Sequence, residues 1–146
     1  MFFTTIKRII KKNRLTRLTK NNMKERNMTY KQFIGAKGEE SAVKLLENNG
    51  FTILKRNYSV HNVGEIDIIA GKAGEIHIVE VRTRLNTGYY PDSVESVAGA
   101  KRKRIVRTAE HFIMENDLYD RNIVFEICMV THDRHGHIER TELVPF

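Results

Sequence analysis

The sequence predicts a small α+β (mixed α/β) domain whose elements follow the order αβββαββ. Residues 30–49 carry apolar side chains at helical spacing, which predicts an amphipathic helix. Two strongly apolar runs, 64–70 and 76–84, flank the Gly-Lys-Ala-Gly segment 71–74, which predicts an antiparallel hairpin. A further helix and two strands complete a mixed, mostly antiparallel sheet with flanking helices.

The first helix is expected to end at Asn49-Gly50, because glycine readily adopts the left-handed conformation that closes a helix. Residues 51–54 then predict a strand, and residues 57–62 predict a polar connection that leads into the hairpin.

The loop 86–92 carries Tyr89 and Tyr90, which could stack on bases, close a lid or simply pack. A second helix is expected to begin near residues 91–93 and to end near Asn116, although its Gly99 weakens the helical pattern. The remaining elements are a strand at 123–131, a turn at 133–136 and a strand at 138–144.

Positive charge is concentrated at the start of the chain. The net charge is +7, but the first 31 residues hold ten Lys/Arg and one acid, a net of +9. The remaining 15 basic and 17 acidic residues give −2. We therefore divide the chain into a basic N-terminal arm, 1–29, which we expect to be disordered, and a folded domain, 30–146.

Two alternatives for the arm stay open. Phe3, Ile6 and Ile10 fall at helical spacing, so the arm could lie as an amphipathic segment on anionic lipid or nucleic acid. A natural start at Met23 or Met28 would remove most of it.

The single cysteine, Cys128, excludes an internal disulfide and a thiolate zinc site, which favours a cytoplasmic protein. Its place on a predicted strand favours a packed core thiol. No apolar run has the length of a membrane span. The sequence leaves a homodimer open.

Acidic side chains occur inside the first apolar run. Alternation along a strand puts Glu65 and Asp67 on one face, opposite Ile66, Ile68 and Ala70. A carboxylate among apolar neighbours is costly unless it is paired, hydrogen-bonded or bound to a metal.

The second run repeats this pattern, with Glu80 and Arg82 on the face of Ile76 and Ile78. The hairpin can bring Asp67 close to Glu80, and two such carboxylates favour a divalent cation.

Helical periodicity selects a third carboxylate. Glu39 lies in the middle of the apolar stripe formed by Ala42, Val43 and Leu46, whereas Glu40 is rotated away from it. We therefore expect Glu39 to point toward the sheet.

The spacing of Asp67, Glu80 and Arg82 is similar to the Asp…Glu-x-Lys core of the PD-(D/E)XK nuclease superfamily, with arginine at the usual lysine position. More closely, the chain resembles the YraN-type family of small, uncharacterised bacterial proteins, over roughly residues 34–146. That likeness rests on Gly38-Glu39 with Ala42, Arg56-Asn57, Gly64-Glu65-Ile66-Asp67, Val79-Glu80-Val81-Arg82-Thr83-Arg84, Lys101 and Ala109. The resemblance implies a restriction-endonuclease-like, resolvase-like core.

We expect Glu39, Asp67 and Glu80, with the backbone carbonyl of Val81, to hold Mg²⁺ or Mn²⁺. The expected catalytic residues are Asp67, Glu80, Arg82 and Lys101. The alternative is an ordinary sheet surface on which the carboxylates pair with Arg82, Arg84 or Lys101.

The predicted second helix carries the only dense basic run of the domain. Lys101 lies near Ile105 on the inward edge of the helical wheel, so we expect it to reach the site. The predicted nucleic-acid contacts are Arg84, Lys101, Arg102, Lys103, Arg104 and Arg107. His132, His135 and His137 resemble metal ligands in spacing, but we interpret them as solvent-exposed turn residues.

These residues together predict a Mg²⁺-dependent endonuclease that acts on DNA, by analogy on branched or flapped structures. Because a guanidinium cannot give up its proton in a protein, Arg82 cannot serve as a general base. The alternative is therefore a non-catalytic DNA-binding module with a degenerate nuclease site.

Overall fold

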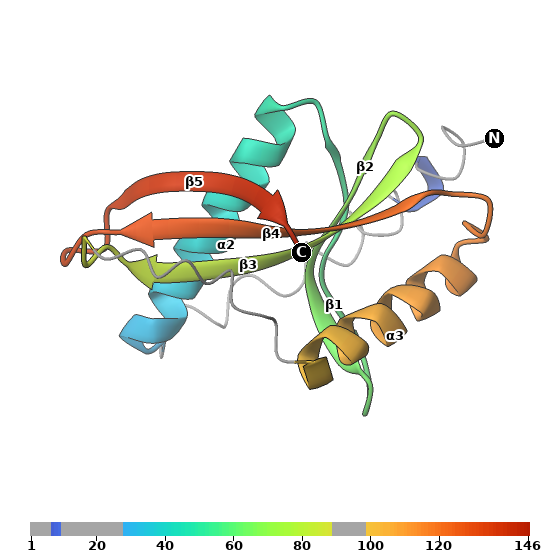
Figure 1. The fold of residues 1–146 in the computed structure, drawn as a ribbon, viewed down its shortest axis with the longest axis horizontal. Helices are drawn as coiled ribbons and strands as arrows, with labels where there is room; N and C mark the ends of the chain where they lie inside the picture. Colours follow the sequence, from blue (N-terminus) through green and yellow to red (C-terminus); the bar gives the residue numbers. More distant parts are fainter. Residues whose placement is uncertain (1–6, 10–27, 89–98) are drawn as a thin grey trace.

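A computed structural model describes residues 7–9, 28–88 and 99–146 of the chain. A five-stranded mixed sheet with flanking helices confirms the predicted order αβββαββ (Figure 1). Its elements are α2 (Tyr30–Asn48), β1 (Thr52–Val60), β2 (Gly64–Lys72), β3 (Glu75–Leu85), α3 (Gly99–Glu115), β4 (Ile123–His132) and β5 (Ile138–Pro145). Tyr89, Tyr90 and the predicted helix start at 91–93 lie outside the described residues.

The strands follow one another across the sheet in the order β1-β2-β3-β4-β5. Neighbours are antiparallel except β3 and β4, which are parallel and are connected through the segment that contains α3. Ala73 and Gly74 at the β2–β3 turn both have positive φ, of 49° and 88°. Such a pair matches the twist of a two-residue hairpin turn, so the predicted hairpin is confirmed. This topology has the arrangement of a restriction-endonuclease-like core.

The first strand is longer than the sequence predicts. Arg56 pairs with Ile68 and Tyr58 with Ile66, so the supposed polar connection forms the second half of β1. The Tyr58 ring is buried and lies 5.3 Å from that of Phe112. The polar side chains of this segment led to the wrong prediction. The extent of an edge strand depends on backbone pairing with its neighbour as much as on its own sequence pattern.

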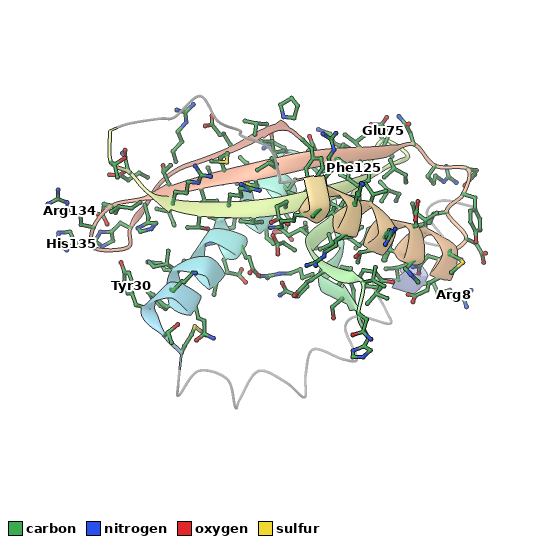
Figure 2. All side chains as sticks on the ribbon, turned by 60° about the horizontal axis from the view of Figure 1, so that its bottom comes forward. Arg8, Tyr30, Glu75, Phe125, Arg134 and His135 are labelled. Carbon is green, nitrogen blue, oxygen red and sulfur yellow. The ribbon has the colours of Figure 1, made fainter. Side chains whose placement is uncertain are left out.

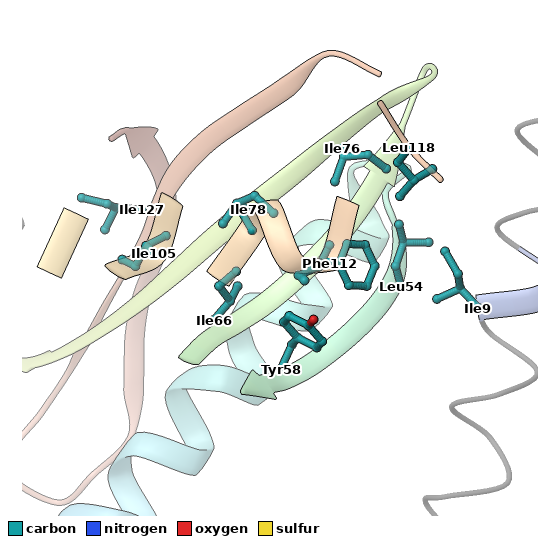
Figure 3. Close-up of a cluster of buried hydrophobic side chains, with 12 residues drawn as sticks. Ile9, Leu54, Tyr58, Ile66, Ile76, Ile78, Ile105, Phe112, Leu118 and Ile127 are labelled. Carbon is teal, nitrogen blue, oxygen red and sulfur yellow. The ribbon is translucent and has the colours of Figure 1, made fainter. Parts of the chain in front are cut away.

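Two hydrophobic clusters lie on opposite faces of the sheet. Ile78 belongs to the cluster under α3 and Val79 to the cluster under α2. Because successive strand residues point to opposite faces, the two helices sandwich the sheet. Figure 3 shows the α3 cluster, in which Phe112 packs among strand isoleucines, with Ile9 of the basic arm at its edge. Each fully buried Ile, Leu or Phe contributes about 1.5–3 kcal/mol.

The predicted face of Ile66 is wrong. Ile68 and Ala70 pack under α2 as one set, but Ile66 packs under α3. Regular alternation therefore breaks at Asp67, between these residues. Among the described residues, no helix is both long enough and apolar enough to cross a membrane.

Gly38 fixes how closely α2 approaches β3. A methyl group at Gly38 would overlap Oγ1 of Thr83 and lie 3.0 Å from its Cβ. Gly35, one turn earlier, has open space around the same position.

We predict that Gly38→Ala lowers the free energy of unfolding by about 1–3 kcal/mol, because the helix must shift. The matched control Gly35→Ala should raise it by about 0.5–1 kcal/mol. Urea titration measures both, and equal effects would contradict this close approach.

Candidate functional site

The two central strands separate at Asp67. Regular pairing of β2 with β3 extends only from Lys72–Glu75 to Ile68–Val79. Beyond this point β2 continues beside β1, whereas β3 continues beside β4. The Asp67 Oδ2 atom accepts a hydrogen bond of 2.7 Å from the Val81 backbone N–H. A side-chain carboxylate therefore satisfies a strand donor at the point where the two strands diverge.

Glu80 is the second carboxylate of this junction and is only 7% exposed. Its Oε1 accepts a hydrogen bond from Nζ of Lys101, which extends from α3. The two carboxylates are close enough for the charge of Glu80 to raise the pKa of Asp67. The structure thus brings together three of the four predicted catalytic residues.

Glu39 approaches the junction from α2. Its side chain is 27% exposed, against 55% for Glu40, so helical periodicity selected the more buried of the two. Asn57 Nδ2 donates to Glu39 Oε2 at 3.4 Å, and Arg56 lies 3.9 Å from the same oxygen. The negative charge of Glu39 also acts on Asp67.

A cavity of about 350 Å³ extends from this junction along the start of α2. Glu39, Asp67 and Val81 line its inner end, and Tyr30 and Lys31 line its outer end. Thr83 and the buried His132 complete the wall on the sheet side. The cavity gives a ligand access to the two carboxylates of Glu39 and Asp67.

Burial dominates the electrostatics of the site. It raises the pKa of Asp67 to about 7, with a further increase from the charge of Glu80 and a decrease from the Val81 hydrogen bond. Burial also raises the pKa of Glu39, against the lowering effects of the Asn57 hydrogen bond and of Arg56. Burial therefore disfavours the ionised form of two carboxyl groups at one junction, which is typical of functional sites.

The residues fit a hard divalent cation in chemistry, since oxygen donors converge and their charge is poorly compensated. In the described part of the chain, however, no three His, Cys, Asp or Glu side chains already form a metal-binding group. Lys101 holds Glu80, while Asn57 and Arg56 hold Glu39. A cation would have to replace these contacts.

The predicted basic residues are distributed around the junction. Arg82 is half-buried and, by alternation, shares the α3 face of β3 with Glu80. Arg104 lines a second hollow with Gly64 and Glu65, on the other side of Asp67 along β2. Arg102 stacks on the ring of Phe146 at 5.0 Å. The exposed members of the predicted set are Arg84, Lys101, Arg102, Lys103, Arg104 and Arg107.

The histidine prediction needs one correction. His135 and His137 are exposed, but His132 is 7% exposed and ends β4, with Nδ1 2.7 Å from the carbonyl oxygen of Asp133. The strand extends one residue further than predicted, so His132 faces the interior. Cys128 is buried as predicted, and burial raises its pKa to about 12.

Sequence reasoning missed Tyr30, Lys31, Thr83 and His132 as cavity residues. No local pattern marks them, because the cavity forms only where α2 crosses the ends of β3 and β4. Gly38 is the one residue whose type could have indicated the cavity, since a glycine allows α2 to cross close to β3.

Residues 38–131 match the profile of the uncharacterised protein family UPF0102. The chain belongs to this family. The matched region contains every residue proposed for the carboxylate junction, including Glu39 and Lys101, whereas Tyr30 and Lys31 precede it.

Similar UPF0102 proteins occur in several bacteria. The protein of Persephonella marina is 40% identical over 106 residues, which cover 72% of this chain and 89% of that protein. The Dictyoglomus turgidum protein is 38% identical, covering 77% and 93%. The Moorella thermoacetica protein is 37% identical, covering 75% and 90%. These UPF0102 relatives share most of their length with this chain.

The raised pKa of Asp67 makes stability depend on pH. Between about pH 4 and pH 7 the unfolded chain loses the Asp67 proton while the folded chain retains it, so stability falls as pH rises through this window. In metal-free buffer, Asp67→Asn should match wild type near pH 4. At pH 8 it should be more stable, by up to about 4 kcal/mol. The measurement is urea unfolding across pH, with the exposed Glu110→Gln as control. A variant less stable than wild type at pH 8 would contradict this account.

Proposed function

We propose that this chain is a divalent-metal-dependent endonuclease that hydrolyses phosphodiester bonds in DNA. The observation that carries the proposal is the strand separation at Asp67, which leaves its carboxylate beside Glu80 with a pKa of about 7. Asp67 and Glu39 line an accessible cavity and Glu80 lies beside Asp67, so carboxylate oxygens converge at a point that suits a hard cation and a phosphate.

Asp67 and Glu80 would hold Mg²⁺ or Mn²⁺, with Glu39 and the backbone carbonyl of Val81 as further oxygen donors. When bound, the cation supplies charge stabilisation of the phosphate oxygens and acidifies a coordinated water. The hydrogen bond from Val81 fixes one Asp67 oxygen and leaves the other for coordination.

Lys101 offers an ammonium to a site in which this chain has Arg82 in place of the usual lysine of the superfamily pattern. Its Nζ contacts Glu80 although the residue belongs to α3 and not to the Glu-x-Lys sequence of β3. An amine can exchange a proton with water, whereas a guanidinium cannot. Lys101 would thus orient or activate water, and Arg82 on the same face would bind the phosphate.

The basic residues of α3 support DNA as the substrate. Arg104 lies beside the hollow that follows Asp67 along β2, and the other exposed cations of α3 flank it in sequence. Neutralising phosphates in this way gives affinity that falls steeply with salt. The exposed cations would position the DNA while the carboxylate junction performs the cleavage.

Removing either central carboxylate tests the proposed chemistry. Asp67→Asn and Glu80→Gln should each lower Mg²⁺-dependent cleavage at least about 100-fold, because they remove charged oxygen donors. DNA affinity in EDTA should persist or rise, since repulsion of phosphate decreases. Cleavage is measured on duplex, single-stranded, flap and four-way DNA.

Thermal unfolding provides a second measurement for the same variants. Mg²⁺ or Mn²⁺ should raise the midpoint of wild type and of Glu110→Gln, but not of Asp67→Asn, because only an intact site binds the cation. If Asp67→Asn and Glu80→Gln both cleave DNA at the wild-type rate, catalysis must take place elsewhere in the chain.

A rescue experiment tests the division of labour between Lys101 and Arg82. Lys101→Met should lower the cleavage rate about 100-fold, whereas Arg82→Lys should retain or raise it. The double variant Lys101→Met/Arg82→Lys should recover much of the loss, since it returns an amine to the same face of β3. Lys44→Met, on the exposed side of α2, is the matched control.

Two outcomes would contradict this scheme. Absence of rescue, with both single variants folded, would mean that Lys101 only neutralises Glu80. If wild type and Arg82→Lys are both inert with every metal and substrate but bind DNA equally well, the chain is a non-catalytic DNA-binding module.

A further inference from the structure

Exposed apolar side chains gather at one end of the described molecule. Six large hydrophobic residues are exposed among the residues that the structure describes. Four of the six occur at this end of the molecule: Met28, Tyr30, Phe33 and Leu85. Leu85 pairs with His132, which lines the same cavity as Tyr30. An exposed apolar patch beside a cavity marks an interaction surface.

The cavity connects this patch to the carboxylate junction. Tyr30, which is 60% exposed, and Lys31 line its outer end, whereas Asp67 lines its inner end. Between them Gly35 leaves the backbone of α2 bare, and a Cβ there would meet no atom within 4 Å. A ligand lying along the cavity would therefore extend from the tyrosine ring to Asp67.

The β4–β5 turn adds positive charge beside Tyr30. Figure 2 shows Arg134 and His135 at the same end of the molecule as Tyr30. The turn is held firmly, because Lys37 Nζ donates to the Gly136 carbonyl oxygen at 2.7 Å and Asp133 Oδ1 accepts from the His135 and His137 N–H groups.

Two cations of this surface are available to a ligand. Lys31 and Arg134 are both exposed, and neither forms an ion pair with any residue that the structure describes. An aromatic face with available cations, leading into a catalytic junction, has the chemistry of a nucleotide site.

We infer that this cavity receives an unpaired nucleotide of single-stranded DNA, next to the phosphodiester that is cleaved. Its base stacks on Tyr30, and Lys31 and Arg134 contact its phosphates. A base inside a duplex is already stacked on both faces, so only an unpaired base can use the tyrosine in this way. The inference rests on the proposed function and specifies its substrate as DNA with a single-stranded segment at the cleavage point.

Binding in EDTA, where no cleavage occurs, tests the inference with the full-length chain. The probes are a fluorescent oligothymidylate of about 16 nucleotides and a duplex of the same length. Tyr30→Ala should weaken single-strand binding about 10-fold and duplex binding less than about 2-fold, because one stacked base is lost. Tyr30→Trp should retain or strengthen single-strand binding. Tyr119→Ala, which removes another exposed tyrosine, should change neither affinity.

A cavity-filling variant provides an independent measurement. Gly35→Leu should weaken single-strand binding about 10-fold or more while thermal unfolding shows an intact fold, because its side chain enters open space. Lys31→Met should lower the slope of log affinity against log salt by about 1.

Unchanged single-strand affinity in both Tyr30→Ala and Gly35→Leu would overturn the inference. A dimer that becomes a monomer in Tyr30→Ala with unchanged DNA affinity would also overturn it, since the patch would then bind a second copy. The two proposals fail separately: selective loss of single-strand binding without any wild-type cleavage leaves this inference standing and removes the nuclease. If cleavage requires Asp67 but not Tyr30, the nuclease proposal stands and this inference is removed.

Discussion

The hydrogen bond from the Val81 N–H to Asp67 Oδ2 is the contact on which the rest of the site depends. Regular backbone pairing between β2 and β3 ends at this point, and a side-chain carboxylate replaces the backbone carbonyl as the acceptor. The strands can separate without leaving this half-buried donor unsatisfied. The separation exposes the carboxylate of Asp67 to a cavity while Glu80 stays beside it. A regular ladder would have kept the two strands paired and closed the opening.

Close helix packing determines which further side chains reach the opening. Gly38 lets α2 lie against Thr83 and so brings Glu39 toward Asp67. Gly64 has the corresponding role for α3, since a Cβ there would lie 2.8 Å from Oγ1 of Thr108. One helix thus contributes a carboxylate and the other contributes Lys101. Burial of Asp67 between the helices, with the nearby charge of Glu80 as a second cause, raises the pKa of its carboxyl group.

Charge is organised differently at the surface and in the site. The net positive charge of the chain comes from the basic arm, whereas the rest of the chain is slightly acidic. Ile9 shows that the arm is not wholly separate from the domain, because it is 5% exposed in the α3 cluster. Under the proposed function, the arm would supply long-range attraction for a polyanion, while the shape of the cavity and the short-range contacts around it would discriminate between DNA structures.

The sequence by itself determined the order of elements, the central hairpin and the proximity of Asp67 to Glu80, because each follows from periodicity and a short turn. The helical wheel also placed Glu39 and Lys101 on inward edges, where the structure has them. Only the tertiary structure decided the full length of β1, the face of Ile66, the burial of His132 and the cavity beside Tyr30. Periodicity encodes which side of its own element a residue occupies. It does not encode where a strand separates from its neighbour or which side chains a distant element places beside it. The site is formed by such contacts between elements that are far apart in the sequence.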